Sequence, residues 1–283
     1  MLRFGVSGST VLSASERLGE LFWEGIDHIE IGSMASAADL DFVLQGAQAR
    51  SLSVSFHSPL WQGGSKYDLL DQYQKTPQEA WDQVAEELTM AREKGVEYVL
   101  VHFPFFLTGE VAQAKAEEQI DTGLQRLAEL QAHYGVHIVC EPKLGLKRDP
   151  AGLDILRAYP VERWRESGLG FCWDMGDYFL GTADWADCRG QLRRWQEVID
   201  VIHVHNGVVR GDRHSWIPVH PSHEGADGYF PVAPFFAEAG RRNALFLWEH
   251  TPHIFPDRAF AQAGFSWARS LIEAVQKERS DEA

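Results

Sequence analysis

The segment Val201-Ile202-His203-Val204-His205-Asn206 decides the fold. Its β-branched apolar residues predict a short buried strand, and the Asn-Gly pair at its end predicts where the strand stops. Side chains alternate across a strand, so His203 and His205 would share one face while Ile202 and Val204 occupy the other. Two imidazoles on one face of a strand end are typical of a metal-bearing strand.

The same pattern, a short apolar run followed by a helical stretch, recurs along the chain. The expected strands are Arg3–Ser7, His28–Gly32, Ser53–His57, Glu97–His102, Val136–Glu141, Leu169–Asp174, Asp200–His205 and Ala244–Glu249. The expected helices are Ser13–Gly25, Ala37–Arg50, Gln78–Lys94, Glu110–Tyr134, Asp149–Ala158, Val161–Glu166, Trp185–Val198, Pro231–Arg241 and Asp257–Lys277. Strands alternating with helices predict a parallel sheet, and eight such units predict a closed (β/α)8 TIM barrel. We expect one α/β domain over residues 1–283, with a frayed, charged tail at 278–283.

Local signals support several helix ends. Ser13 with Glu16 three residues later predicts a capping box. Pro77 fits the first turn of its helix, and Gly95 and Gly135 fit the glycine position that follows a helix C-terminus.

Composition restricts the function classes. A hydrophobic content of 45% in 283 residues is enough for a large core. The net charge of −15 gives no basic footprint and disfavours a nucleic-acid partner. We find neither an apolar run of membrane-spanning length nor a secretory leader, which favours a cytoplasmic protein without membrane contact. Cys140, Cys172 and Cys188 are scattered, as expected of reduced thiols in that compartment.

Seven of the eight expected strands end in a residue type that binds metals or transfers protons. These residues are Glu30, His57, His102, Glu141, Asp174, His203 with His205, and Glu249. A single polar residue at a strand end also fits a solvated position. As a set they fit an active site, because TIM barrels carry theirs at the C-terminal strand ends. So many carboxylates would repel one another unless a cation neutralised them, which points to a divalent metal.

The ordered motifs resemble the xylose-isomerase-like TIM-barrel superfamily, which includes sugar isomerases and epimerases, inosose dehydratase and endonuclease IV. The resemblance rests on Phe56-His57-Ser58-Pro59, Val101-His102-Phe103-Pro104, Cys172-Trp173-Asp174-Met175-Gly176-Asp177, and His203-Val204-His205-Asn206 with the Asp212-Arg213-His214 and Glu224-Gly225 that follow. It implies one divalent metal, Mn, Mg, Co or Zn, held by Glu141, Asp174, His203 and Glu249.

One position departs from the family pattern. Asp177 stands where the family commonly has a histidine, which holds substrate in sugar epimerases and ligates zinc in endonuclease IV. By the same resemblance, several residues match additional zinc ligands of the endonuclease. The set left open for a second metal or for substrate is His57, His102, Asp177, His205, Asp212 and His214. The alternative for Asp212-Arg213-His214 is a polar loop whose charges pair with one another.

The metal site predicts a reaction class. A divalent ion would chelate adjacent oxygens of a hydroxy-ketone and polarise its carbonyl, while Glu141 and Glu249 act as acid and base on opposite faces. The expected function is isomerisation or epimerisation of a sugar, ketose or polyol-derived hydroxy-ketone. Alternatives are a dehydratase of the inosose type, an endonuclease IV-like phosphodiesterase, or a catalytically silent ligand-binding barrel.

Tryptophans near strand ends suggest how a carbohydrate would be held. One or more of Trp61, Trp173, Trp216 and Trp248 would form an apolar wall against a sugar ring. The expected partner is therefore a small carbohydrate, with homo-oligomerisation left open.

Overall fold

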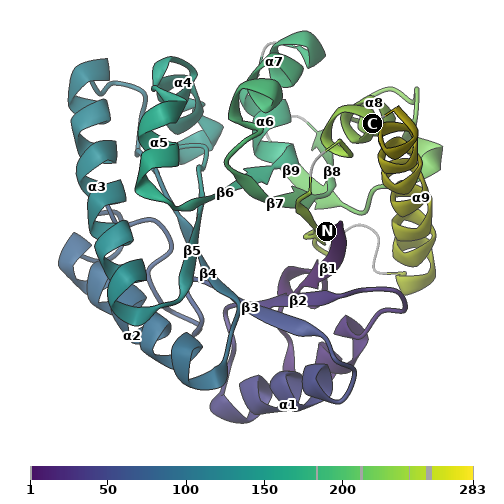
Figure 1. The fold of residues 1–283 in the computed structure, drawn as a ribbon, viewed down its shortest axis with the longest axis horizontal. Coiled ribbons are helices and arrows are strands. Elements are labelled where there is room, and N and C mark those ends of the chain that lie inside the picture. The colour runs from purple at the N-terminus through teal and green to yellow at the C-terminus, as the bar shows by residue number, and fades with distance from the viewer. Residues whose placement is uncertain (1, 183, 211–212, 242, 253–256, 283) are drawn as a thin grey trace.

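Eight parallel strands close into a barrel, as the alternating sequence predicts (Figure 1). The computed structural model describes residues 2–182, 184–210, 213–241, 243–252 and 257–282, without the side chains of residues 209, 210, 213, 214 and 282. The barrel order is β1-β10-β7-β6-β5-β4-β3-β2. Its strands are β1 (Arg3–Ser7), β2 (His28–Ile31), β3 (Ser53–His57), β4 (Tyr98–His102), β5 (His137–Glu141), β6 (Gly170–Asp174), β7 (Ile199–Val204) and β10 (Leu245–Trp248).

Helices surround the barrel on its outer side (Figure 1). They are α1 (Ala37–Gln48), α2 (Pro77–Lys94), α3 (Gln113–Tyr134), α4 (Ala151–Ala158), α5 (Val161–Ser167), α6 (Met175–Gly181), α7 (Trp185–Trp195), α8 (Val232–Ala239) and α9 (Arg258–Glu282). Pro77 opens α2, and Gly95 and Gly135 follow α2 and α3 with a φ of 68°, as predicted. Helix α9 continues through Glu282, so most of the segment we expected to be frayed is helical.

The predicted helix Ser13–Gly25 is wrong. A 3₁₀-helix, η2 (Ser15–Leu21), lies within this range, and another, η1 (Gly8–Val11), precedes it. Leu12 and Ser13 have positive φ values of 55° and 49°, which interrupt any continuous helix. The Ser13 hydroxyl donates to the Gly32 carbonyl at 2.6 Å, so it tethers the end of β2 and forms no capping box.

A short helix and a two-stranded hairpin near the site were not predicted. Helix α6 begins directly after β6, because the Asp174 side chain accepts a hydrogen bond from the Asp177 amide at 2.7 Å and caps the helix. Strands β8 (Asn206–Arg210) and β9 (Arg213–Ile217) form an antiparallel hairpin beyond β7, where the sequence suggested only a loop.

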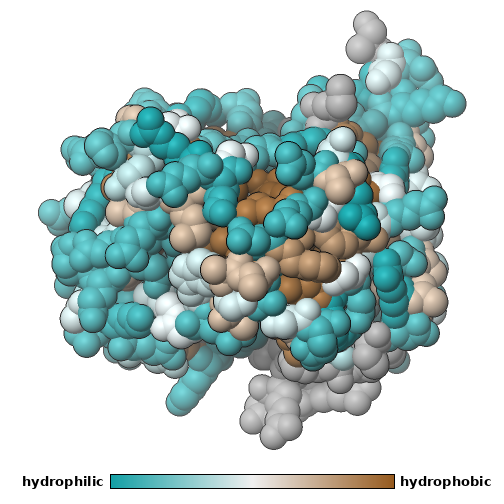
Figure 2. All heavy atoms as spheres, turned by 90° about the horizontal axis from the view of Figure 1, so that it is seen from below, coloured by the Kyte–Doolittle hydropathy of each residue, from teal (hydrophilic) through white to brown (hydrophobic). Residues whose placement is uncertain are grey.

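The two faces of each strand meet two different cores. A small cluster fills the barrel interior and includes Tyr98, Leu100, Val201 and Leu245. A larger cluster lies between strands and helices and includes Ile202 and Val204. Figure 2 shows one face covered largely by hydrophilic residues, with hydrophobic residues gathered near its centre. Among the described residues, no helix combines the length and apolarity needed to cross a membrane.

Glu87 on α2 is a buried carboxylate outside the barrel. Its Oε1 accepts a hydrogen bond from the Leu60 amide at 2.8 Å. Burial raises the pKa of Glu87 to about 7, although hydrogen bonds from Ser58 and Leu60 oppose the rise. A carboxyl group with a raised pKa in the folded state favours folding below its unfolded pKa, and that contribution is lost as pH rises through 7.

We expect Glu87→Gln to stabilise the protein at pH 8 by about 1–3 kcal/mol and to have little effect near pH 4.5. The amide can still accept the Leu60 hydrogen bond, but it carries no charge to desolvate at high pH. Denaturant unfolding at the two pH values measures the effect, and exposed Glu86→Gln on the same helix is the control. Equal stability changes at both pH values would contradict the assignment.

Candidate metal centre

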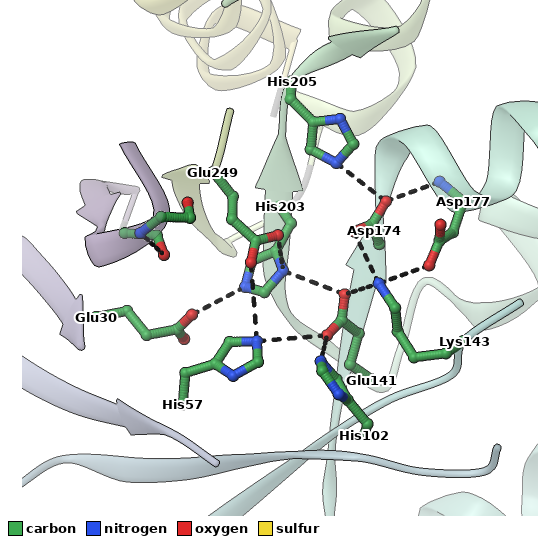
Figure 3. Close-up of polar contacts among 12 residues, drawn as sticks. Glu30, His57, His102, Glu141, Lys143, Asp174, Asp177, His203, His205 and Glu249 are labelled. Carbon is green, nitrogen blue, oxygen red and sulfur yellow. Dashed lines mark hydrogen bonds and ion pairs between the residues drawn. The ribbon is translucent and has the colours of Figure 1, made fainter. Parts of the chain in front are cut away.

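Four ligand-type side chains converge at the C-terminal ends of adjacent strands (Figure 3). Glu141 ends β5, Asp174 ends β6, His203 lies near the end of β7, and Glu249 follows β10. One candidate ligand atom from each lies within 4.8 Å of those of the other three. Glu141, Asp174 and His203 are buried, and the Glu249 side chain is 17% exposed. The sequence-predicted set is therefore brought together.

The His203 ring lies between carboxylates on both of its nitrogens. Nδ1 lies 2.8 Å from Glu249 Oε2 and 3.3 Å from Glu141 Oε1. Nε2 lies 3.2 Å from Glu30 Oε1. Burial lowers the pKa of His203, but the surrounding negative groups outweigh it and raise that pKa well above its ordinary value. The geometry places one ring nitrogen at the candidate centre and the other toward the barrel interior.

His57 and His102 lie against Glu141 in the same way as each other. Their Nδ1 atoms lie 3.1 Å from the backbone oxygens of Ser58 and Lys66, respectively. With Nδ1–H donating to these carbonyls, Nε2 of each ring faces Glu141 Oε2, at 3.7 and 3.0 Å. Burial lowers the pKa of His57, but Glu141, Glu30 and Glu249 outweigh it and raise that pKa above its ordinary value. Burial lowers the pKa of His102 to about 4, which keeps that ring neutral.

These residues fit a divalent cation. Within the part of the chain that the structure describes, Glu141 Oε2 is buried and has no hydrogen-bond partner. An acceptor facing neutral imidazole lone pairs is unfavourable unless a proton or a metal ion lies between them. Metal-ligating histidines commonly donate their other ring N–H to a carbonyl or carboxylate, as the three rings here are placed to do. The nitrogen and oxygen donors suit Zn²⁺ and the other first-row divalent ions.

Lys143 introduces a cation among the carboxylates. Its Nζ lies 3.0 Å from Glu141 Oε1, 3.4 Å from Asp174 Oδ2 and 2.6 Å from Asp177 Oδ2. Burial opposes the ammonium charge, but these three carboxylates raise the pKa of Lys143 well above its ordinary value. Burial raises the pKa of Asp177 to about 6, with Lys143 opposing the rise.

The residues expected around a second metal do not form one cluster among the described residues but have different partners. His57 and His102 lie with Glu141, their candidate ligand atoms within 4.8 Å of one another. Asp177 pairs with Lys143, and Arg148 lies 3.4 Å from its other oxygen. His205 Nε2 lies 3.1 Å from Asp174 Oδ1. Asp212 and the side chain of His214 lie outside the described residues.

The aromatic wall predicted from sequence is wrong for two residues. Trp173 and Trp248 are fully buried in the outer core, where they stack on Tyr178 and pack edge-on against Phe265, respectively. They adjoin Asp174 and Glu249 in sequence, so strand alternation turns them away from the barrel interior. Trp61 is half-buried near Met34.

Other aromatic rings lie beside the site. Trp216 lies 4.4 Å from His205 between ring centroids. Tyr67, which sequence reasoning missed, stacks on His102 at 5.1 Å. Tyr67 belongs to the loop between β3 and α2, where no periodic pattern marks the position of a side chain.

A polar pocket adjoins the candidate ligands. It has a volume of about 240 Å³ and is lined by His57 and Glu249 together with Lys66 and several hydroxyl residues. The hydroxyls belong to Ser7, Ser9, Ser13, Ser33 and Thr251. Glu249 therefore belongs both to the candidate ligand set and to the lining of a pocket that can admit a small molecule. Glu141 is fully buried and does not line this pocket.

Comparisons with known proteins agree with this architecture. A sequence model of the xylose isomerase-like TIM barrel family matches residues 20–271. Among solved structures, an L-ribulose 3-epimerase has a TM-score of 0.70 at 15% identity, over 100% of this chain and 98% of that one. A D-tagatose 3-epimerase-like protein has a TM-score of 0.65 at 16% identity, over 98% and 99% of the two chains. An IolI protein with a bound zinc atom has a TM-score of 0.64 at 14% identity, over 99% and 97%. No curated protein matches the chain.

Proposed function

Because this chain belongs to the xylose isomerase-like TIM barrel family, we propose that it is a divalent-metal-dependent isomerase or epimerase of a sugar, ketose or polyol-derived hydroxy-ketone. One observation carries the proposal. Glu141, Asp174, His203 and Glu249 come from neighbouring strands and place their candidate ligand atoms within 4.8 Å of one another. The fold likeness to sugar epimerases supports the same reaction class.

Glu141, Asp174, His203 and Glu249 would hold the metal, and Mn, Mg, Co and Zn all suit this donor set. When bound, the ion supplies a Lewis acid that polarises a substrate carbonyl and acidifies the neighbouring C–H. The hydroxyl-lined pocket orients a polyhydroxylated molecule beside Glu249. Its volume of about 240 Å³ suits a monosaccharide-sized substrate.

Glu249 and Glu141 would move the proton. Glu249 lines the pocket and removes a proton from the carbon next to the carbonyl. Glu141 faces the same His203 nitrogen as Glu249, and in its protonated form it would return a proton to the substrate. Lys143 Nζ lies 3.0 Å from Glu141 Oε1, and His102 Nε2 lies 3.0 Å from Oε2. Return to the same carbon from the opposite face gives an epimer, and return to the adjacent carbon gives an isomer.

The test is solvent exchange with the purified, metal-loaded protein. We expect deuterium from D2O at the carbon next to the carbonyl for one or more members of a panel of ketoses, aldoses and inososes. Exchange is visible even when net conversion is slow. Chelator-treated protein is the control, and a panel in which metal-loaded protein neither exchanges nor converts any member would contradict the proposal.

A phosphodiesterase is the second candidate, favoured by the His57–His102–Glu141 cluster. That cluster offers two imidazoles to a second ion, and paired metals serve in-line displacement at phosphorus. The Lys143–Asp177 ion pair disfavours the phosphodiesterase, because Asp177 is paired with an ammonium group and is not free to bind a second metal ion. Two equivalents of bound metal with cleavage of abasic-site DNA would favour this candidate, and loss of water from an inosose would favour a dehydratase.

A further inference from the structure

A carboxylate that is not among the candidate ligands lies directly behind His203. Glu30 on β2 is fully buried in the barrel. Figure 3 shows its side chain directed toward the His203 ring, and Glu30 Oε1 lies 3.2 Å from His203 Nε2. Its other oxygen, Oε2, accepts a hydrogen bond from the Tyr98 hydroxyl at 2.8 Å. Glu30 therefore spans the space between the candidate metal centre and the interior of the barrel.

The contacts continue away from the site. Tyr98 lies on β4, and Ser55 lies on the neighbouring β3. The Ser55 hydroxyl lies 2.7 Å from His28 Nε2, and His28 Nδ1 lies 2.7 Å from the Ser53 hydroxyl. The His28 ring stacks on Tyr98 with a centroid distance of 5.4 Å and an interplanar angle of 6°. A polar chain on three strands thus holds Glu30 in place from the side opposite His203.

A buried carboxylate in this position needs a reason. Well-packed apolar side chains often stabilise a protein as well as a buried ion pair does, so stability alone does not require Glu30. Glu30 is required instead to orient the His203 ring and to fix which ring nitrogen carries the proton. Within the described residues, Glu30 Oε1 and His203 Nε2 are both buried and have no hydrogen-bond partner, although they lie 3.2 Å apart. A proton on Nε2 would lie between them and would leave the lone pair on Nδ1, the atom that lies 3.3 Å from Glu141 and 2.8 Å from Glu249.

We propose that Glu30 is a positioning residue for metal binding, which holds His203 as the Nε2–H tautomer, and that Tyr98 holds Glu30. The inference rests on the proposed function, since it concerns the affinity of that same centre for its ion. Partners of this kind typically contribute 10–100-fold to metal affinity.

Two variants test this chain of polar contacts, one beside His203 and one further from the metal. Glu30→Gln keeps the size of the side chain and removes its charge, and we expect zinc affinity to fall by about 10–100-fold. Tyr98→Phe touches no candidate ligand and removes only the hydroxyl that holds Glu30, so we expect a smaller loss in the same direction. The measurement is Zn²⁺ binding in competition with a chromophoric chelator.

A matched control separates positioning from stability. Leu245→Ala removes an apolar side chain from the same barrel interior and is expected to lower stability without changing zinc affinity. Nitrogen NMR of ¹⁵N-histidine-labelled, zinc-bound protein, assigned with His203→Ala, should show the His203 proton on Nε2. That readout holds even where Glu30→Gln fails to fold.

The outcomes are distinguishable. Wild-type zinc affinity in both variants, or a His203 proton on Nδ1, would overturn the role of Glu30 while leaving the proposed function intact. No binding of Zn²⁺, Mn²⁺, Co²⁺ or Mg²⁺ by the wild-type protein would overturn both. Weaker binding in Glu30→Gln and Tyr98→Phe but not in Leu245→Ala supports the positioning role.

Discussion

We expect Glu249→Gln to lower turnover on the true substrate by about 10²–10⁴-fold, with the protein still folded. Glu249 lines the polar pocket and also faces His203, so we assign it both proton abstraction and metal binding. An amide oxygen can still ligate an ion, so metal affinity should fall only in part. An amide accepts no proton near neutral pH, so the general-base contribution should disappear.

Glu141→Gln should lose turnover to a similar extent and should lose more metal affinity. Glu141 is fully buried, and its oxygens face Lys143, His102 and His57. A neutral amide loses the negative charge that attracts the Lys143 ammonium and a divalent ion, and its NH2 group takes the place of one ligand oxygen. Glu238→Gln, which alters a carboxylate paired with Arg193 outside the barrel, is the control and should retain turnover.

Solvent deuterium incorporation at the carbon next to the carbonyl measures the chemical step in both variants. Metal content is measured on the same samples, so a rate loss is separated from a loss of the ion. Exchange at the wild-type rate in metal-loaded Glu249→Gln would remove Glu249 from proton transfer and leave it as a ligand only.

Strand periodicity explains why the centre could be predicted from sequence. Each ligand follows an apolar run of β-propensity, and closing eight such runs into a barrel brings their ends to one rim. Closure of the barrel therefore brings Glu141, Asp174, His203 and Glu249 together, with candidate ligand atoms within 4.8 Å of one another. Alternation also places Trp173 and Trp248 on the outer side, since each precedes an inward-facing carboxylate, and this excludes both from the predicted aromatic wall.

Sequence periodicity does not predict where loop side chains lie. Tyr67 and Lys143 reach the site from segments without periodicity, so their positions depend on the path of the backbone. Leu12 and Ser13 adopt positive φ although neither residue type predicts it, which is why no helix begins at Ser13 and only the shorter η2 forms within the expected range. Only one residue separates β7 from β8. The Asn206-Gly207 pair that begins β8 is typical of a strand end, so the sequence predicted a loop where the hairpin β8–β9 forms.

Replacing Lys143 by Met should destabilise the chelator-treated protein by about 3–5 kcal/mol, the typical effect of removing one partner of a buried ion pair. The Lys143 side chain is only 12% exposed, and its ammonium contacts Glu141, Asp174 and Asp177. Arg148 lies 3.4 Å from one Asp177 oxygen, but its side chain is 39% exposed and compensates little. Without Nζ, buried carboxylates must either repel one another or take up protons at a free-energy cost.

A divalent ion should restore part of that stability, because it supplies positive charge to Glu141 and Asp174 where the ammonium no longer does. The measurement is guanidinium unfolding of wild type and Lys143→Met, each with chelator and with Mn²⁺. Lys94→Met removes a surface lysine that pairs with Asp41 at 3.1 Å, so it should cost under about 1 kcal/mol and show no dependence on Mn²⁺. If Lys143→Met lost the same free energy with and without Mn²⁺, the ammonium and the metal would act on different carboxylates. If nothing were lost in chelator, Lys143 would not be the counter-ion that holds these acids together.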